Sequence, residues 1–360
     1  MAELLKDRFM TDESLNEFSS IITKYFPEFN TSTFLADVQD ENWKGLELKE
    51  KMRHITKCLH KQLPDSYAKA VEVLKKAAYE VKGFESMCLP DYVELYGLEE
   101  WDVSLPAMHH FTQFSSSEFA IRPYLIKDIE KTMEFMSSCA NDDKKNVRRF
   151  ASEGCRPRLP WAMAVHALKK DPSLILLVLE KLKDDESEFV RRSVANNLND
   201  ISKDHPDIVL KIAEEWLGYS ENRDKLVKHA LRTLLKAGNS KAMILFGFGD
   251  PVNLDIEKFT LGQDSIKIDE ESRFNFDLVV KESDVKVRLE YAVYYQKARG
   301  KISKKVFKIG EKKYKEGICA INRKYGFVNQ STRKIYPGKH EIGIVVNGVE
   351  KAKASIEVVE

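Results

Sequence analysis

Two acids and one tryptophan stand among arginines in the middle of the chain, and their types could support chemistry. Glu153 and Asp200 each follow a Val-Arg-Arg sequence, and Trp161 lies between them. Carboxylates can stabilise positive charge that develops during a reaction and can orient a water molecule. Judged on residue types alone, ordinary ion pairs between helices are favoured, because charge at helical spacing usually belongs to a solvated face. Which interpretation holds depends on the elements that carry these residues.

The Val-Arg-Arg sequence is part of a repeat. It occurs at Val147–Arg149 and at Val190–Arg192, and a weaker copy, Val-Lys-His, begins at Val227. The copies are 43 and 37 residues apart, close to the period of roughly 40–47 residues for HEAT-type helical pairs. The spacing therefore predicts stacked pairs of helices.

Helical periodicity dominates the first two thirds of the chain. From Leu4 to about Ala140, apolar residues recur at three- and four-residue spacing, which indicates several short amphipathic helices. Pro160 and Pro206 are expected in the first turn of their helices, where a missing N–H does no harm. Beyond Asp143 the pattern predicts shorter helices over residues 145–153, 160–169, 174–182, 188–202, 206–217 and 224–237.

The pattern changes to strand periodicity near Pro251. Apolar and polar residues alternate over residues 274–278, 285–289 and 340–344, as in half-buried strands. Asn347-Gly348 is a strong signal for a two-residue hairpin turn. About seven short strands would suit an immunoglobulin-like β-sandwich. We therefore expect a mainly α chain, with a HEAT-like α-solenoid over residues 1–250 followed by a small β-sandwich over residues 251–360.

Composition limits the classes of partner. The chain holds 58 Lys and Arg against 57 Asp and Glu, whereas residues 251–360 hold 22 against 16. Local basic patches on a nearly neutral protein suit reversible binding to nucleic acid. Five cysteines without a CxxC pair favour reduced thiols in the cytoplasm and offer no clear metal site. No apolar run is long enough to span a membrane.

Four segments resemble the AlkC branch of the AlkC/AlkD-type DNA glycosylases, HEAT-like proteins that remove alkylated bases from DNA. The segments are SSEFAIRPYL (116–125), RRFASEGCRPRLPWA (148–162), DPS (171–173) and VRRSVANNLNDISKDHP (190–206). The resemblance covers most of residues 1–250, and the remainder looks like the immunoglobulin-like module of some AlkC members. It implies a monofunctional glycosylase of base excision repair, acting on cationic alkylated bases, chiefly 3-methyladenine, in duplex DNA. It implies no dedicated base pocket, no metal and no organic cofactor.

The resemblance also implies roles for four residues. Glu118, Glu153 and Asp200 would stabilise positive charge on the sugar as the glycosidic bond breaks. Asp200 is the first choice for positioning water, while Glu153 and Glu118 would add negative potential and contact the lesion or deoxyribose. Trp161 would pack its ring against the sugar, where a cation–π contact strengthens as charge develops. Without the resemblance, Glu118 could equally cap a helix and Trp161 could fill the core.

Basic residues supply candidate DNA contacts in both parts of the chain. In the helical part the candidates for phosphate binding are Arg156, Arg158, Arg191, Arg192 and Lys203. The first arginine of each Val-Arg-Arg copy is explained as readily by packing between helices as by a contact with DNA. In the β part, Lys304 and Lys305 lie in a basic stretch that either contacts DNA or protects a sheet edge from aggregation.

Two other functions remain open from the sequence. A HEAT and immunoglobulin-like chain could be a non-catalytic adaptor, since such arrays are frequently scaffolds. It could also be a DNA-damage sensor that binds without turnover. For the glycosylase we expect a monomer in the cytoplasm, associated with the nucleoid when bound to DNA.

Overall fold

The computed structural model describes residues 10–330 and 333–360. Residues 1–9, which include the start of the predicted helical stretch, lie outside the described residues. The helices are α2 (Asp12–Tyr25), α3 (Thr31–Val38), α4 (Leu48–His60), α5 (Tyr67–Ala77), α6 (Cys88–Tyr96), α7 (Trp101–Phe111), α8 (Arg122–Lys127), α9 (Ile129–Cys139), α10 (Lys145–Gly154), α11 (His166–Lys170), α12 (Ser173–Leu182), α13 (Glu188–Ile201), α14 (Pro206–Trp216), α15 (Glu221–Ala230), α16 (Arg232–Lys236) and α17 (Ser240–Leu245). Short 3-10 segments are η1 (Trp43–Gly45), η2 (Phe84–Met87), η3 (Pro251–Asn253) and η4 (Ala298–Gly300). None of the helices described is long and apolar enough to cross a membrane.

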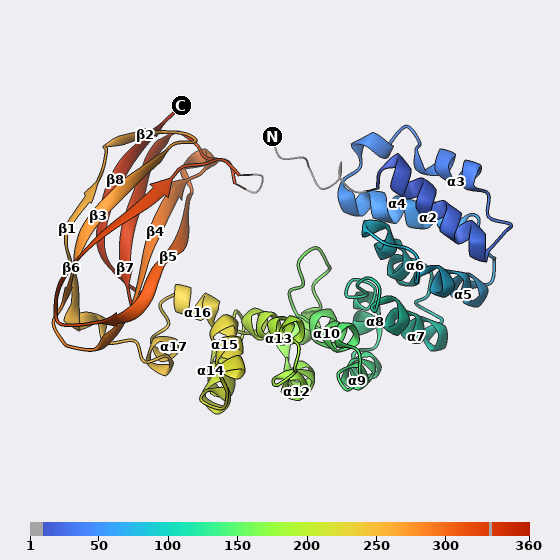
Figure 1. Ribbon diagram of the computed structural model, residues 1–360, viewed down its shortest axis with the longest axis horizontal. Coiled ribbons are helices and arrows are strands. Elements are labelled where there is room, and N and C mark those ends of the chain that lie inside the picture. Colours follow the sequence, from blue (N-terminus) through green and yellow to red (C-terminus); the bar gives the residue numbers. More distant parts are fainter. Residues whose placement is uncertain (1–9, 331–332) are drawn as a thin grey trace. The chain divides into compact units, whose positions relative to one another are not determined.

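The strands follow the helices along the chain. They are β1 (Leu254–Leu261), β2 (Ser265–Lys267), β3 (Glu271–Val280), β4 (Val285–Gln296), β5 (Ile302–Tyr314), β6 (Gly317–Gly326), β7 (Gly338–Val346) and β8 (Val349–Val359). The class is therefore mixed, with a helical region followed by a β-rich region (Figure 1). Two compact units divide the chain: one extends to Val209 and includes Trp216–Ala230, and the other holds Leu210–Glu215 and Leu231–Glu360.

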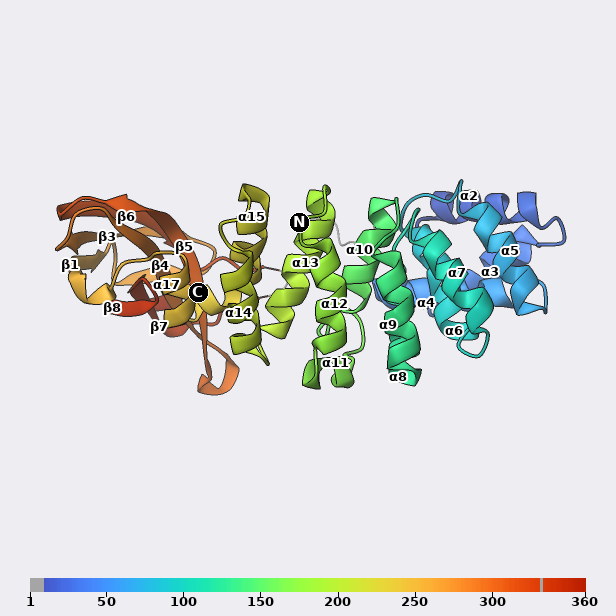
Figure 2. The same ribbon diagram turned by 90° about the horizontal axis from the view of Figure 1, so that it is seen from below.

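Helices in the middle of the first unit pack in two layers. α9 and α12 lie in one layer and α10, α13 and α15 in the other (Figures 1 and 2). α10 packs against α9, α12 and α13, and α13 packs in turn against α15. Val147 and Val190, the first residues of the two Val-Arg-Arg copies, are completely buried in this packing. The predicted pairing of helices is thus present where the repeat occurs.

The first arginine of each copy holds the turn that precedes its own helix. Arg148 and Arg191 each donate hydrogen bonds from Nη1 to the carbonyl oxygens five and six residues earlier. Arg148 also contacts the buried Asp185 with Nε and Nη2, at 2.5 and 3.1 Å. These arginines satisfy backbone carbonyl acceptors in the turns that precede α10 and α13, where no helical N–H is available to pair with them. These hydrogen bonds support the packing interpretation of the first arginine at both copies.

One predicted helix is wrong. Residues 160–169 do not form a helix from Pro160; the chain instead makes a loop over residues 155–165, the Trp161 loop, before the short α11. Arg122 donates hydrogen bonds to the carbonyl oxygens of Arg156 and Met163, on both sides of the loop. Because Arg122 pairs with these carbonyl groups, the loop does not require helical hydrogen bonds to satisfy them. The predicted helix over residues 224–237 is also divided, into α15 and α16.

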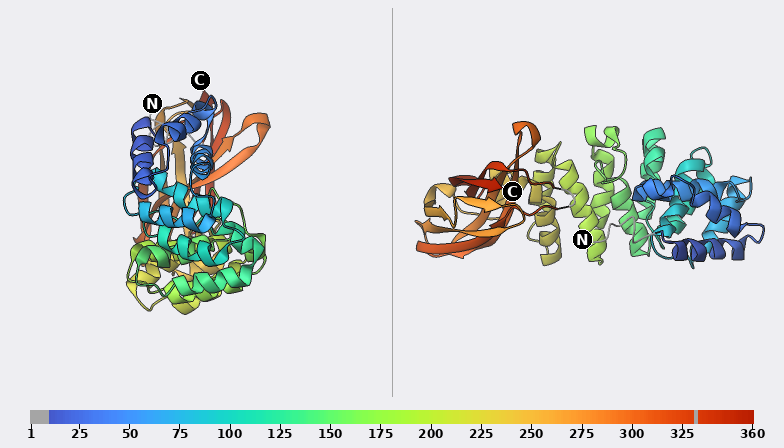
Figure 3. Two further views of the ribbon diagram at one scale, coloured as in Figure 1. Left: turned by 90° about the vertical axis from the view of Figure 1, so that its right-hand side faces the viewer. Right: turned by 90° about the horizontal axis from the view of Figure 1, so that it is seen from above.

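The strands of the second unit form two sheets. One has the order β1-β3-β6 and the other β2-β8-β7-β4-β5. Among the strands that the structure describes, β2 and β8 alone pair in parallel. The strands of this unit, coloured yellow to red, are drawn from two further sides in Figure 3. Inward side chains such as Phe274 of β3 and Ile344 of β7 are completely buried in the core of the unit. The predicted hairpin is confirmed, because Val346 pairs with Val349 and both Asn347 and Gly348 have positive φ angles, 45° and 82°.

The role of Arg148 gives a test of the repeat. We expect Arg148→Met to lower the free energy of unfolding by about 2–4 kcal/mol, because Asp185 would stay buried without its cation. The exposed Arg192, which makes no hydrogen bond or ion pair within the described chain, is the control. Arg192→Met should change that free energy by less than ~0.5 kcal/mol. Urea unfolding followed by helical circular dichroism measures both, and equal effects would contradict the assignment.

Candidate active site

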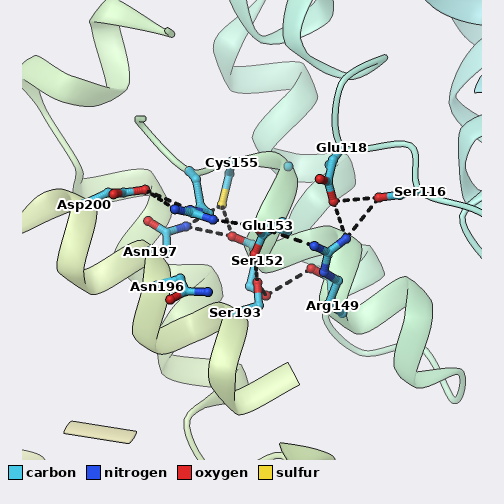
Figure 4. Close-up of polar contacts among 12 residues, drawn as sticks. Ser116, Glu118, Arg149, Ser152, Glu153, Cys155, Ser193, Asn196, Asn197 and Asp200 are labelled. Carbon is cyan, nitrogen blue, oxygen red and sulfur yellow. Dashed lines mark hydrogen bonds and ion pairs between the residues drawn. The ribbon is translucent and has the colours of Figure 1, made fainter. Parts of the chain in front are cut away.

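The three candidate acids lie close together on neighbouring elements of the first unit. Glu153 is at the end of α10, Asp200 is in the last turn of α13, and Glu118 lies in the turn before α8. Figure 4 shows their side chains joined by arginines. Glu153 and Asp200 are 5% and 2% exposed. A carboxylate that is buried this deeply remains charged only where partners of opposite charge are present.

Arg156 bridges the two most buried acids. Its Nη1 lies 2.5 Å from Glu153 Oε1, and its Nε and Nη2 both lie 2.8 Å from Asp200 Oδ2. Burial lowers the pKa of Arg156, but the two carboxylates outweigh this effect and hold that pKa above its usual value. Arg156 is only 7% exposed. Its placement does not support the phosphate contact expected from the sequence.

Arg149 makes the second bridge. It contacts Glu118 Oε2, and its Nη2 lies 3.5 Å from Glu153 Oε1. Ser116 Oγ accepts a hydrogen bond from Arg149 Nη1 at 3.0 Å and donates one to Glu118 at 2.6 Å. The guanidinium carbon of Arg149 also lies 5.2 Å from the centre of the Phe189 ring. Arg149 was not among the expected site residues, although it is the second arginine of the first Val-Arg-Arg copy.

The second carboxylate oxygens of Glu153 and Asp200 have partners as well. Ser193 Oγ donates to Glu153 Oε2 at 2.6 Å, and Lys203 Nζ lies 2.9 Å from Asp200 Oδ1. Acids and bases therefore alternate along one chain of contacts, in the order Glu118, Arg149, Glu153, Arg156, Asp200 and Lys203. Their charges balance, so the acids are fixed in orientation by cations. The ion pairs expected from residue types alone are thus present at the site that the resemblance indicates.

Arg122 fixes the base of the Trp161 loop. Its Nη1 donates to the carbonyl oxygens of Gly154 and Arg156 at 2.8 and 2.6 Å, and its Nε and Nη2 donate to that of Met163. Burial lowers the pKa of Arg122 to about 10. Five donors in a planar fork suit this task, because one side chain can reach three carbonyl groups. Sequence reasoning missed this residue, although it belongs to SSEFAIRPYL.

Trp161 does not fill the core. The residue is 62% exposed and its φ angle is +66°. A left-handed backbone at a bulky residue costs on the order of 1–3 kcal/mol and persists only where the surroundings impose it. The loop therefore presents an indole ring to solvent.

The other expected cations differ in their surroundings. Arg158 pairs with Asp204 through two hydrogen bonds of 3.0 and 2.6 Å, and this contact lowers the pKa of Asp204. Arg191 holds its turn, as described above. Arg192 is exposed beside a hollow of about 450 Å³ between α13 and α15. That hollow is also lined by Lys225, and its lining includes none of the three acids.

Lys304 and Lys305 lie on the edge strand β5. Successive residues of a strand point to opposite faces, so the two side chains do not share a surface. Lys304 Nζ lies 3.8 Å from Glu350 Oε2 and 5.2 Å from the centre of the Tyr294 ring. Lys305 is exposed and makes no ion pair within the described chain. Among all the residues that the structure describes, no group of three or more His, Cys, Asp or Glu could hold a metal ion.

Comparison with known proteins found two relatives that are similar to this chain over nearly their whole length. Residues 255–360 match the family described as "Uncharacterised protein YhaZ, C-terminal Ig-like domain". The "Uncharacterized protein YhaZ" of Bacillus subtilis (strain 168) is 41% identical over 348 residues, which cover 96% of this chain and 97% of YhaZ. The alkylpurine DNA glycosylase AlkC of Pseudomonas fluorescens was solved bound to DNA containing an abasic site analog. Its structure is similar with a TM-score of 0.95 and 35% identity, covering 99% of this chain and 100% of that chain.

The bridge made by Arg156 can be tested by removing it. We expect Arg156→Met to lower the free energy of unfolding by about 3–5 kcal/mol, because two buried carboxylates lose a shared cation. In the Glu153→Gln/Asp200→Asn background the same substitution should cost far less, since the amides need no counter-charge. Arg158→Met, which breaks a more exposed pair, should cost less than ~1 kcal/mol. Urea unfolding of the variants measures the cycle, and additive effects would exclude the bridge.

Proposed function

Because this chain belongs to the AlkC family of alkylpurine DNA glycosylases, we propose that it is a monofunctional DNA glycosylase of base excision repair. It hydrolyses the N-glycosidic bond of cationic alkylated bases, chiefly 3-methyladenine, in duplex DNA. The observation that carries the proposal is the cluster of Glu118, Glu153 and Asp200, which two arginines hold together in a chain similar to AlkC over its whole length.

The acids supply electrostatic stabilisation. A cationic base is a good leaving group, so the enzyme need not protonate it, and the sugar becomes positive as the bond breaks. Carboxylates already fixed by Arg149 and Arg156 need little reorganisation to stabilise that charge, which is the condition under which such stabilisation is strongest. Asp200 positions the attacking water, and Glu153 and Glu118 face the lesion or deoxyribose. The exposed Trp161 ring packs against the sugar through a cation–π contact.

The proposed site works without a dedicated base pocket. The exposed Trp161 supports approach to the sugar from an open surface. Arg158, Arg192 and Lys203 contact phosphates, and Lys203 leaves Asp200 when it does so. Arg191 keeps its hydrogen bonds to the turn before α13 and adds to the local positive potential. No metal or organic cofactor takes part in this proposal.

The proposal assigns a task to each part of the chain. Residues 1–250 form the glycosylase domain, which we interpret as a HEAT-like solenoid from the two-layered helices and the period of the repeat. Residues 251–360 form an immunoglobulin-like domain that clamps the duplex through basic residues of β5, and the family match over residues 255–360 supports this fold. The enzyme acts as a monomer in the cytoplasm and joins the nucleoid when bound to DNA.

Base release from methylated duplex DNA is the decisive experiment. We expect the wild-type protein to release 3-methyladenine, identified by mass. Asp200→Asn and Glu153→Gln should lower the rate by roughly 10²–10³-fold while DNA binding is retained, because fixed carboxylates no longer stabilise the sugar. Glu214→Gln, which replaces an exposed acid of α14, is the matched control and should keep the wild-type rate.

Two outcomes would support other functions. Tight binding to methylated DNA without release above the spontaneous background would favour a damage sensor. An adaptor would show neither release nor preference for damaged DNA, and its function would tolerate replacement of all three acids.

The two lysines of β5 test the clamp. Each phosphate contact contributes about 0.9 to the slope of log affinity against log salt concentration. We expect Lys305→Gln to reduce this slope by about one contact, because Lys305 has no internal partner among the described residues. Lys304→Gln should leave the slope nearly unchanged, since Lys304 already faces Glu350 and Tyr294. Two unchanged slopes would favour protection of the sheet edge against aggregation.

A further inference from the structure

The backbone of Trp161 requires a cause outside its own segment. Its φ of +66° is unfavourable for a bulky residue, and the residue, which is 62% exposed, receives little packing that would compensate. Such a conformation persists where contacts made by other elements impose it. The contacts of the Trp161 loop therefore show what imposes it.

Arg122 accounts for the base of the loop only. Its hydrogen bonds reach the carbonyl groups of Gly154, Arg156 and Met163. The carbonyl oxygen of Trp161 itself accepts a hydrogen bond from Lys49 Nζ at 2.6 Å. Lys49 belongs to α4, 112 residues earlier in the chain. The loop is thus held at its base by α8 and at its tip by α4.

The same ammonium group contacts the segment that carries Glu118. Lys49 Nζ lies 4.9 Å from the centre of the Phe119 ring, within the range of a cation–π contact. Phe119 directly follows Glu118. One cation therefore joins the tip of the Trp161 loop to the segment of a candidate acid, although neither lies near it in sequence.

We infer that Lys49 is a positioning residue, which holds the Trp161 ring at a fixed place relative to Glu118 before DNA arrives. The inference rests on the proposed function, because a fixed ring affects the reaction only through its contact with the deoxyribose. It also gives the amino-terminal helices a task in the site. α4 supplies no candidate acid, yet it sets the geometry of the exposed aromatic residue.

The test compares three variants of the full chain. Lys49→Met removes the donor and keeps most of the side-chain stem, and Lys49→Arg restores a donor with the same charge. Lys57→Met removes an exposed lysine from the same helix and controls for the loss of charge. Hydrogen exchange over residues 155–165 is measured without DNA, and excision of 3-methyladenine is measured in single turnovers. Lys49→Gln is a second variant if Lys49→Met does not fold.

We expect Lys49→Met to raise hydrogen exchange in the Trp161 loop and to slow excision by about 10- to 100-fold, as loss of positioning does. Its affinity for DNA should stay within a factor of about two of wild type, since a positioning contact contributes little to ground-state binding. Lys49→Arg should recover most of the rate. Lys57→Met should match wild type in loop exchange and rate.

The failures of the two proposals can be told apart. Unchanged loop exchange in Lys49→Met would overturn the inference whatever the activity. Raised exchange with an unchanged excision rate would also overturn it, because the contact would then have no effect on the reaction. Raised exchange in a protein whose wild type releases no base would instead refute the proposed glycosylase.

Discussion

The buried bridge of Arg156 is the contact on which the candidate site depends. Glu153 and Asp200 end neighbouring helices and are almost fully buried, where an unpaired charge would cost several kcal/mol. Arg156 lies between them and contacts both. The ends of α10 and α13 are therefore held together by the same atoms that keep the two carboxylates in place. The packing of the helices and the orientation of the acids have one common cause.

This shared cause explains why the helical unit carries so many charges where a repeat would ordinarily bury apolar residues. Arg149 extends the bridge to Glu118, and the more exposed Lys203 ends it at the second carboxylate oxygen of Asp200. Each acid has a partner, so the cluster can form before any ligand is present. In the proposed reaction, the sugar enters a field that the fold has already arranged.

Much of the fold follows from patterns that act over short distances. The helical pairs could be predicted because Val147 and Val190 recur at a regular spacing, and the hairpin because Asn347-Gly348 favours positive φ angles. The Trp161 loop could not be predicted, since its shape depends on donors in α4 and α8 that are distant in sequence. The burial of Arg156 likewise follows from packing between helices. Local patterns identify a basic residue, but they do not show whether water or a carboxylate surrounds it.

The two Val-Arg-Arg copies reveal how a repeat can acquire a site without losing its architecture. In each copy the first arginine, Arg148 or Arg191, is committed to the turn of its own repeat. The second arginine has no such commitment: Arg149 joins the acids, whereas Arg192 faces solvent. One position of the motif thus holds the turn, while its neighbour carries charge that the turn does not use. In the first copy that spare charge orients two acids, so a single repeated motif serves both the scaffold and the site.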